Sequence, residues 1–123
     1  MSTIKKNFIK LLREYNLTDA IVYPTAGGEV CLNLEGTLAI VWTDGRYPEI
    51  KDGYSVNKIC TETITVLYGY VVVDIRDELM VLEKGDRLAV TPETLYSLSG
   101  KAVCLVEISP KWDSEQNSFT QNS

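Results

Sequence analysis

The chain has 123 residues, of which 45% are hydrophobic and 24% are charged, a composition that is typical of one soluble globular domain. Its formal net charge of −5 argues against nucleic acid as the main partner, because phosphate binding needs a basic surface. No apolar run approaches the roughly 18 residues that a membrane span needs, and the N-terminus lacks the apolar block of a signal peptide. We therefore expect a cytoplasmic protein that binds neither nucleic acid nor a membrane.

The sequence contains no histidine. Histidine is the usual general base of serine and cysteine hydrolases and the commonest protein ligand of transition metals. A metal site would have to use carboxylates or thiolates alone, and the three cysteines, Cys31, Cys60 and Cys104, are too scattered to form one. We therefore predict a protein without a metal or other cofactor, and we interpret the cysteines as buried thiols rather than as a disulfide or redox site.

The N-terminal segment from Ser2 to Asn16 is expected to form an amphipathic helix that Ser2 or Thr3 caps. Apolar side chains fall on one face at helical spacing, namely Ile4, Phe8, Leu11, Leu12 and Tyr15. This face could dock on the body of the domain or on a second subunit, or the lysine-rich helix could bind anionic lipid. We favour docking, because the helix is short and the protein is acidic overall.

The rest of the chain shows β-like runs separated by Gly, Asp and Pro. The predicted strands are Asp19–Tyr23, Glu29–Leu34, Thr37–Thr43, Tyr54–Cys60, Thr63–Ile75, Glu78–Leu82, Arg87–Val90 and Ala102–Ile108. A turn is expected at Asp44–Pro48, and Gly69, inside the longest run, is expected to mark a bulge, a bend or a close backbone approach. Short connections between strands favour consecutive antiparallel hairpins, and thus an all-β barrel or sandwich.

The predicted core consists of apolar residues inside these runs, namely Val66, Leu67, Val71, Val73, Leu88, Val90, Leu105 and Ile108. After Pro110 the pattern is lost, and residues 113–123 are rich in Ser, Gln and Asn. We therefore expect a single domain over residues 1–112, followed by a flexible C-terminal tail.

The segment from Gly53 to Trp112 resembles the small single-domain cupins. The first cupin motif ends in a glutamate and, after six further residues, a glycine, and Glu62 and Gly69 match this pair. The second motif begins with a glycine, which Gly85 matches, and its histidine place then falls on Tyr96. The resemblance implies a cupin-type antiparallel β-barrel (a double-stranded β-helix or jelly roll) with a short N-terminal helix. Because small cupins are usually dimeric, it also implies a homodimer.

The sequence departs from the family at the histidines of the first motif. With three residues before the glutamate, the two histidine places fall on Val56 and Lys58, and with four residues they fall on Ser55 and Asn57. Three of the four usual metal ligands are therefore missing, and a lone carboxylate does not hold a transition metal. The resemblance implies the barrel and not the metal chemistry.

In such a barrel the matched positions point inward, so Lys58, Glu62 and Tyr96 would share one cavity mouth, and Glu62 and Tyr96 would lie on the same inner wall. These three residues are the candidates for acid–base catalysis, and together with Tyr68 they are the candidates for ligand binding. The alternative is that Lys58 and Glu62 pair on the surface while Tyr96 fills the space of the lost metal.

Two kinds of function remain open. We favour a metal-free cupin-fold protein that binds a small sugar- or metabolite-like molecule, or that serves as an accessory subunit. The alternative is a metal-independent isomerase, epimerase or lyase that acts on a small polar or sugar-derived substrate by general acid–base catalysis. A deep pocket with converging polar residues would favour the enzyme, and a plugged barrel would favour a structural role.

Overall fold

A computed structural model describes residues 3–17, 20–25, 27–76 and 78–120. Within these ranges the chain forms one α-helix, two short 3-10 helices and a series of strands. In chain order, the elements are α1 (Thr3–Glu14), β1 (Ile21–Pro24), β2 (Gly28–Leu32), β3 (Leu38–Tyr47), η1 (Ile50–Asp52), β4 (Tyr54–Asn57), β5 (Thr61–Ile75), β6 (Glu78–Glu83), β7 (Arg87–Val90), β8 (Ser97–Ser109), η2 (Ser114–Gln116) and β9 (Asn117–Thr120).

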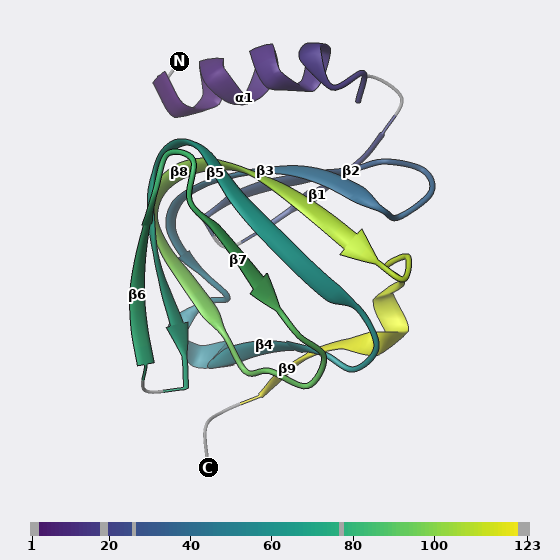
Figure 1. The fold of residues 1–123 in the computed structure, drawn as a ribbon, viewed down its shortest axis with the longest axis vertical. Coiled ribbons are helices and arrows are strands. Elements are labelled where there is room, and N and C mark those ends of the chain that lie inside the picture. Colours follow the sequence, from purple (N-terminus) through teal and green to yellow (C-terminus); the bar gives the residue numbers. More distant parts are fainter. Residues whose placement is uncertain (1–2, 18–19, 26, 77, 121–123) are drawn as a thin grey trace.

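The strands form two antiparallel sheets that curve into a barrel (Figure 1). The larger sheet has the order β1-β2-β3-β8-β5-β6, and β7 pairs with another part of β5. The smaller sheet consists of β4 and β9, which lie at the side of the barrel away from α1 in Figure 1. The all-β antiparallel architecture with a short N-terminal helix that the sequence predicted is therefore confirmed.

The long central strand β5 contains an irregularity that reverses its inward-facing side. Its register with β8 shifts between Val66 and Tyr68. Before the shift, Ile64 and Val66 belong to the core inside the barrel, and after it Val71 and Val73 do. One extra residue therefore changes the inward-facing positions from even to odd numbers, as a β-bulge does.

Gly69 follows this bulge, and it fulfils the prediction of a close backbone approach. Its φ is +79°, and a Cβ atom at this position would lie 2.0 Å from the backbone oxygen of Lys101. Any side chain there would force β5 and β8 apart, so only glycine fits.

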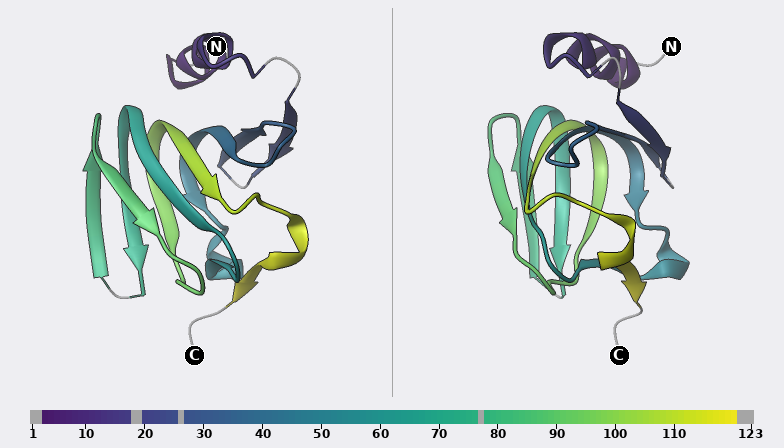
Figure 2. Two further views of the ribbon diagram at one scale, coloured as in Figure 1. Left: turned by 45° about the vertical axis from the view of Figure 1, so that its right-hand side comes forward. Right: turned by 90° about the vertical axis from the view of Figure 1, so that its right-hand side faces the viewer.

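Successive side chains of the strands point alternately to two hydrophobic clusters, one inside the barrel and one on its outer face. The inner cluster lies inside the barrel, and it includes Val66, Val71, Val73, Ala102 and Cys104. The outer cluster lies between the sheet and α1, and it consists of Ile4, Phe8, Leu17, Cys31, Ile40 and Val103, with further half-buried residues around them. Figure 2 shows α1 lying across the outside of the barrel.

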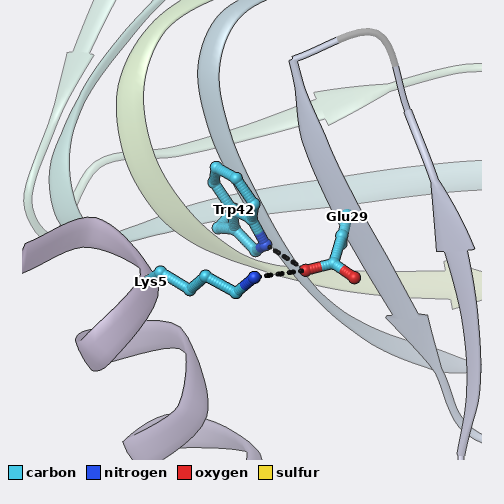
Figure 3. Close-up of polar contacts among 3 residues, drawn as sticks. All are labelled: Lys5, Glu29 and Trp42. Atoms are coloured by element: carbon cyan, nitrogen blue, oxygen red, sulfur yellow. Dashed lines mark hydrogen bonds and ion pairs between the residues drawn. The ribbon is translucent and has the colours of Figure 1, made fainter. Parts of the chain in front are cut away.

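The helix docks on the body of its own chain, which is one of the alternatives that the sequence left open. Phe8 is buried, and its ring centroid lies 6.4 Å from that of Trp42 on β3. Trp42 also donates a 3.0 Å hydrogen bond to Glu29 Oε1, and Lys5 Nζ lies 3.8 Å from the same oxygen (Figure 3). Asn16 ends the helical segment with a left-handed φ of 56°. The expected cap residue Ser2 lies outside the described residues, and Tyr15 is exposed rather than packed.

One sequence expectation about element boundaries is wrong. The turn expected at Asp44–Pro48 is a continuation of β3, which pairs with β8 as far as Tyr47 opposite Leu98. Gly45 lies directly opposite Gly100 in this ladder, so the glycine that resembled turn punctuation is part of a strand. The first part of the strand predicted at Asp19–Tyr23 lies outside the described residues.

The C-terminal segment also differs from the expected flexible tail. The Asp113 side chain caps η2 by accepting hydrogen bonds from the backbone N–H groups of Glu115 and Gln116. The strand β9 then pairs with β4, from Asn117 opposite Asn57 onward. Residues 121–123 lie outside the described residues. A polar composition hid this strand, because its stability comes from pairing with a distant segment.

The predicted core is correct for Val66, Val71, Val73, Val90 and Ile108, which are buried. The three leucines of that prediction, Leu67, Leu88 and Leu105, are half-buried at the edges of the two clusters. All three cysteines are free and buried, and burial raises the pKa of Cys60 to about 11 and that of Cys104 to about 12. Within the described residues, no helix is long and apolar enough to cross a membrane.

Replacing Phe8 by alanine tests the docking of α1. Because Phe8 is 4% exposed, the change should lower the free energy of unfolding in urea by about 3–5 kcal/mol. The exposed Lys6 on the same helix provides the control, and Lys6→Ala should change the value by less than about 0.5 kcal/mol. Equal, small losses for both variants would mean that α1 does not contribute to the folded body.

Candidate functional site

The barrel contains a partly open cavity of about 500 Å³. Much of its wall is apolar and comes from the inward positions of β2, β3, β5 and β8, namely Val30, Leu32, Ala39, Val41, Ile64, Leu98, Val106 and Ile108. The strand alternation that builds the inner cluster therefore also builds this wall. Inner-cluster residues such as Leu32, Ala39 and Ile64 form part of the cavity wall.

Glu62 and Tyr96 meet at this cavity. The Tyr96 hydroxyl donates a 2.9 Å hydrogen bond to Glu62 Oε1, across 34 positions of sequence. Tyr96 is held at the start of β8 by two backbone hydrogen bonds with Ser55, of 2.8 and 3.0 Å. Both Glu62 and Tyr96 line the cavity, so the prediction that they share one inner wall is confirmed.

Two side-chain amides in series, those of Gln116 and Asn57, place a hydrogen-bond donor against the Glu62 carboxylate. Gln116 Oε1 accepts hydrogen bonds from the backbone N–H groups of Ile59 and Cys60, at 3.2 and 3.4 Å. Its Nε2 therefore turns the other way and donates to Asn57 Oδ1 at 3.1 Å. Asn57 Nδ2 in turn donates to Glu62 Oε1 at 2.8 Å. Because backbone N–H groups can only donate, they set the direction of every bond in this relay.

The C-terminal strand supplies a second amide to the same network. Asn117 Nδ2 lies 2.8 Å from Asn57 Oδ1 and 3.1 Å from Ser55 Oγ. The Tyr47 hydroxyl also lies 3.4 Å from Ser55 Oγ. The segment that the sequence analysis assigned to a tail thus positions the residues around Glu62.

The four-residue spacing of the cupin motif agrees with this geometry. It puts the two histidine places at Ser55 and Asn57, whose side chains are buried in the network, whereas Lys58 is exposed. Together with Glu62 and Tyr96, these places present a hydroxyl, an amide, a carboxylate and a phenol. Such a set does not suit a transition metal. Among the described residues, no group of three or more His, Cys, Asp or Glu side chains is arranged to hold a metal ion.

Two predicted site residues lie outside the cavity. Lys58 follows β4, with its side chain exposed, and the place expected for it beside Glu62 is taken by Asn57. Tyr68 packs with Leu67 in the cluster beneath α1. The bulge in β5 turns these two consecutive side chains to the same outer face, which a regular strand would not do.

Sequence reasoning missed most of the aromatic residues at the cavity. The rings of Tyr23 and Trp112 lie 5.9 Å apart, and those of Tyr47 and Phe119 lie 6.0 Å apart. All four side chains line the cavity. The alternation of β3 puts Tyr47 at the cavity and Trp42 on the outer face. No local signal marks Phe119, because its place depends on the pairing of β9 with β4.

Burial shifts the proton equilibria of the central pair. Burial raises the pKa of Glu62 above its ordinary value of 4.5, and the hydrogen bonds from Tyr96 and Asn57 oppose this rise. The pKa of Tyr96 is raised well above 10, first by burial and then by the nearby Glu62 carboxylate. The pair therefore has a neutral phenol as donor and a carboxylate that holds a proton more readily than it does in water.

Comparison with known proteins identifies the fold. No family model and no curated protein sequence matches the chain. Among solved structures, a variant of Pac13 from Streptomyces with uridine matches with a TM-score of 0.74 and 13% identity, covering 85% of this chain and 88% of that one. Another Pac13 structure is described as that of a nucleoside dehydratase.

Two further neighbours differ from Pac13 in what they do. The capsular polysaccharide assembling protein CapF from Staphylococcus aureus has a TM-score of 0.64 and 12% identity, with 83% of this chain and 31% of that chain covered. Drosophila melanogaster CENP-C bound to CAL1 has a TM-score of 0.60 and 17% identity, with 86% and 96% covered. At these identities the likeness concerns the fold, which is that of the cupins, as the sequence motifs predicted.

The substitution Tyr96→Phe tests the central hydrogen bond. It keeps the ring but removes one donor from Glu62, so the free energy of unfolding should fall by about 1–3 kcal/mol. Tyr47→Phe is the matched control, because it removes a hydroxyl of the same cavity that makes only a 3.4 Å contact. Urea denaturation of both variants measures the difference. Losses of the two variants that agree within about 0.5 kcal/mol would show that the Tyr96–Glu62 hydrogen bond contributes no more to stability than the Tyr47 contact does.

The raised pKa of Glu62 predicts how stability depends on pH. The folded state holds this proton more tightly than the unfolded chain does, so the contribution of the group is fully present below pH 4.5 and is lost as the pH rises through the folded pKa. Glu62→Gln keeps the acceptor oxygen but cannot titrate. Its free energy of unfolding, minus that of the wild type, should therefore increase from pH 4 upward and then level off. Urea titrations at a series of pH values measure this difference, and a decrease would contradict the assignment.

Proposed function

We propose that the protein binds a small polar molecule, sugar-like or nucleoside-like, inside the barrel, with Glu62 as the main polar anchor. One observation carries this proposal: a carboxylate with two positioned donors stands at an otherwise largely apolar cavity of about 500 Å³. Ligand sites commonly combine an apolar wall of this size with a few fixed polar groups. The cavity inside the barrel argues against a purely structural role.

Two of the solved structures that share the fold support the proposal of a small ligand. A Pac13 structure contains uridine, and CapF is a capsular polysaccharide assembling protein. CENP-C was solved with the protein CAL1, so the same fold also serves protein binding. The aromatic pairs at the cavity favour the small ligand for this chain, because Tyr and Trp rings offer flat surfaces to a sugar or a base.

We also propose that the protein forms a homodimer. The strand β1 stands at an edge of the larger sheet, and its apolar side chains Ile21, Val22 and Tyr23 are 44%, 50% and 38% exposed. An unpaired edge of this kind favours pairing with another chain.

A metal-independent isomerase, epimerase or lyase is the second candidate. The geometry that favours it is the contact between Tyr96 and Glu62, because a carboxyl group with a raised pKa that faces a cavity can exchange a proton with a substrate. In this version Glu62 exchanges a proton with the substrate, and Tyr96 orients the carboxyl group.

Ligand-observed NMR with a panel of nucleosides and monosaccharides tests the binding function. At least one compound should bind the wild type, and Val41→Phe, which adds volume at the cavity wall, should weaken binding at least tenfold. Val81→Phe provides the control, since Val81 is 61% exposed on β6. Binding that survives Val41→Phe unchanged would place the ligand elsewhere, and a panel without any binder would count against the proposal.

The same samples separate binding from catalysis. If the protein is an enzyme, signals of a converted product should grow over hours with the wild type and stay absent with Glu62→Gln, although that variant still binds. Constant spectra for every compound that binds would favour the binding protein.

A further inference from the structure

We propose that the cavity selects ligands without negative charge, so that the natural ligand is an unphosphorylated ring compound with O–H or N–H donors, and the corresponding phosphate ester is rejected. This inference rests on the proposed function and specifies its ligand class. It follows from the charges at the wall, from the direction of the hydrogen bonds and from the apolar surroundings.

The charged residues at the cavity are acidic. Glu49, Asp52 and Glu62 line it, and among the described lining residues there is no lysine or arginine. Arg46 lies nearby in the sequence, but its guanidinium donates to the backbone oxygens of Pro48 and Gly53 at 2.6 and 2.9 Å. Glu49 already has an interaction partner. A phosphate in the cavity would therefore meet the carboxylates of Asp52 and Glu62, with no lysine or arginine among the described lining residues.

Hydrogen-bond direction leads to the same class of ligand. The two donors that approach Glu62, from Tyr96 and Asn57, both bind Oε1. The other oxygen, Oε2, has no donor among the described residues and is not among the fully buried unpartnered atoms. It is left to accept from a ligand hydroxyl or N–H group. An ionised phosphate offers only acceptors, so the two groups would repel each other.

The apolar wall of the cavity increases the difference in affinity between a neutral compound and its phosphate ester. Transfer of a phosphate dianion from water to this cavity loses hydration, and the cost is large where no cation replaces the water. A neutral ring loses less hydration and gains contact with residues such as Ile64 and Val106, and with the Tyr23–Trp112 and Tyr47–Phe119 pairs. The same cavity thus favours the uncharged compound over its phosphate ester.

Matched pairs of compounds test the selection by isothermal titration calorimetry. The pairs are uridine with uridine 5′-monophosphate, adenosine with adenosine 5′-monophosphate, and N-acetylglucosamine with its 6-phosphate. In every pair with a binder, the neutral compound should bind at least tenfold more tightly. A phosphate ester that binds equally well or better overturns the inference but leaves the binding function standing. Pairs in which neither compound binds, across the whole set, overturn the inference and the nucleoside- or sugar-like ligand together.

A pair of charge variants tests whether Glu62 causes the selection. Glu62→Gln should reduce the affinity ratio of neutral to phosphorylated compound by on the order of tenfold or more, because a carboxylate a few ångströms from a phosphate repels it strongly at protein dielectric values. Glu78→Gln makes the same change in net charge at an exposed position on β6 and should leave the ratio unchanged. Equal effects of the two variants would assign the selection to net charge and overturn the role of the cavity. The wild-type comparison stands independently of how either variant folds.

Discussion

One extra residue in β5 decides which side chains the barrel can turn inward. The register shift between Val66 and Tyr68 lets a single strand present Glu62 to the cavity at one end and Val71 to the packed core at the other. Without it, the inward face of one half would become the outward face, and either the core or the site would be lost. Gly69 makes the arrangement possible, because the backbone of β8 approaches too closely there for any Cβ atom.

The places of the metal ligands in the cupin motif are taken by other polar groups in this barrel. They hold a hydroxyl, an amide, a carboxylate and a phenol, which hydrogen-bond to one another or to Asn117. Backbone N–H groups at Ile59 and Cys60 orient Gln116, which orients Asn57, which faces Glu62. Buried polar networks of this kind make a structure specific, because each member would be costly if left alone.

The same hydrogen-bond network connects the C-terminal strand β9 to the site. Asn117 and Gln116 bring donors to Asn57, and Phe119 packs its ring near Tyr47. The segment contributes few buried apolar side chains, so hydrogen bonds and strand pairing hold it in place rather than burial. Because this segment lies beside the cavity, a part of the chain rich in Ser, Gln and Asn helps to shape the proposed ligand site.

The resemblance to the cupin motifs implied that Glu62 and Tyr96 meet. The sequence by itself determined the elements with local patterns, namely the amphipathic helix and the alternating strands. These patterns are read from neighbours a few residues apart, where periodicity is a direct consequence of backbone geometry. Only the tertiary structure decided that Lys58 points to solvent, that Tyr68 packs under the helix and that Asn117 joins the network. Each of these depends on a register or a pairing between distant segments, and a one-residue shift in register reverses the face to which a side chain points.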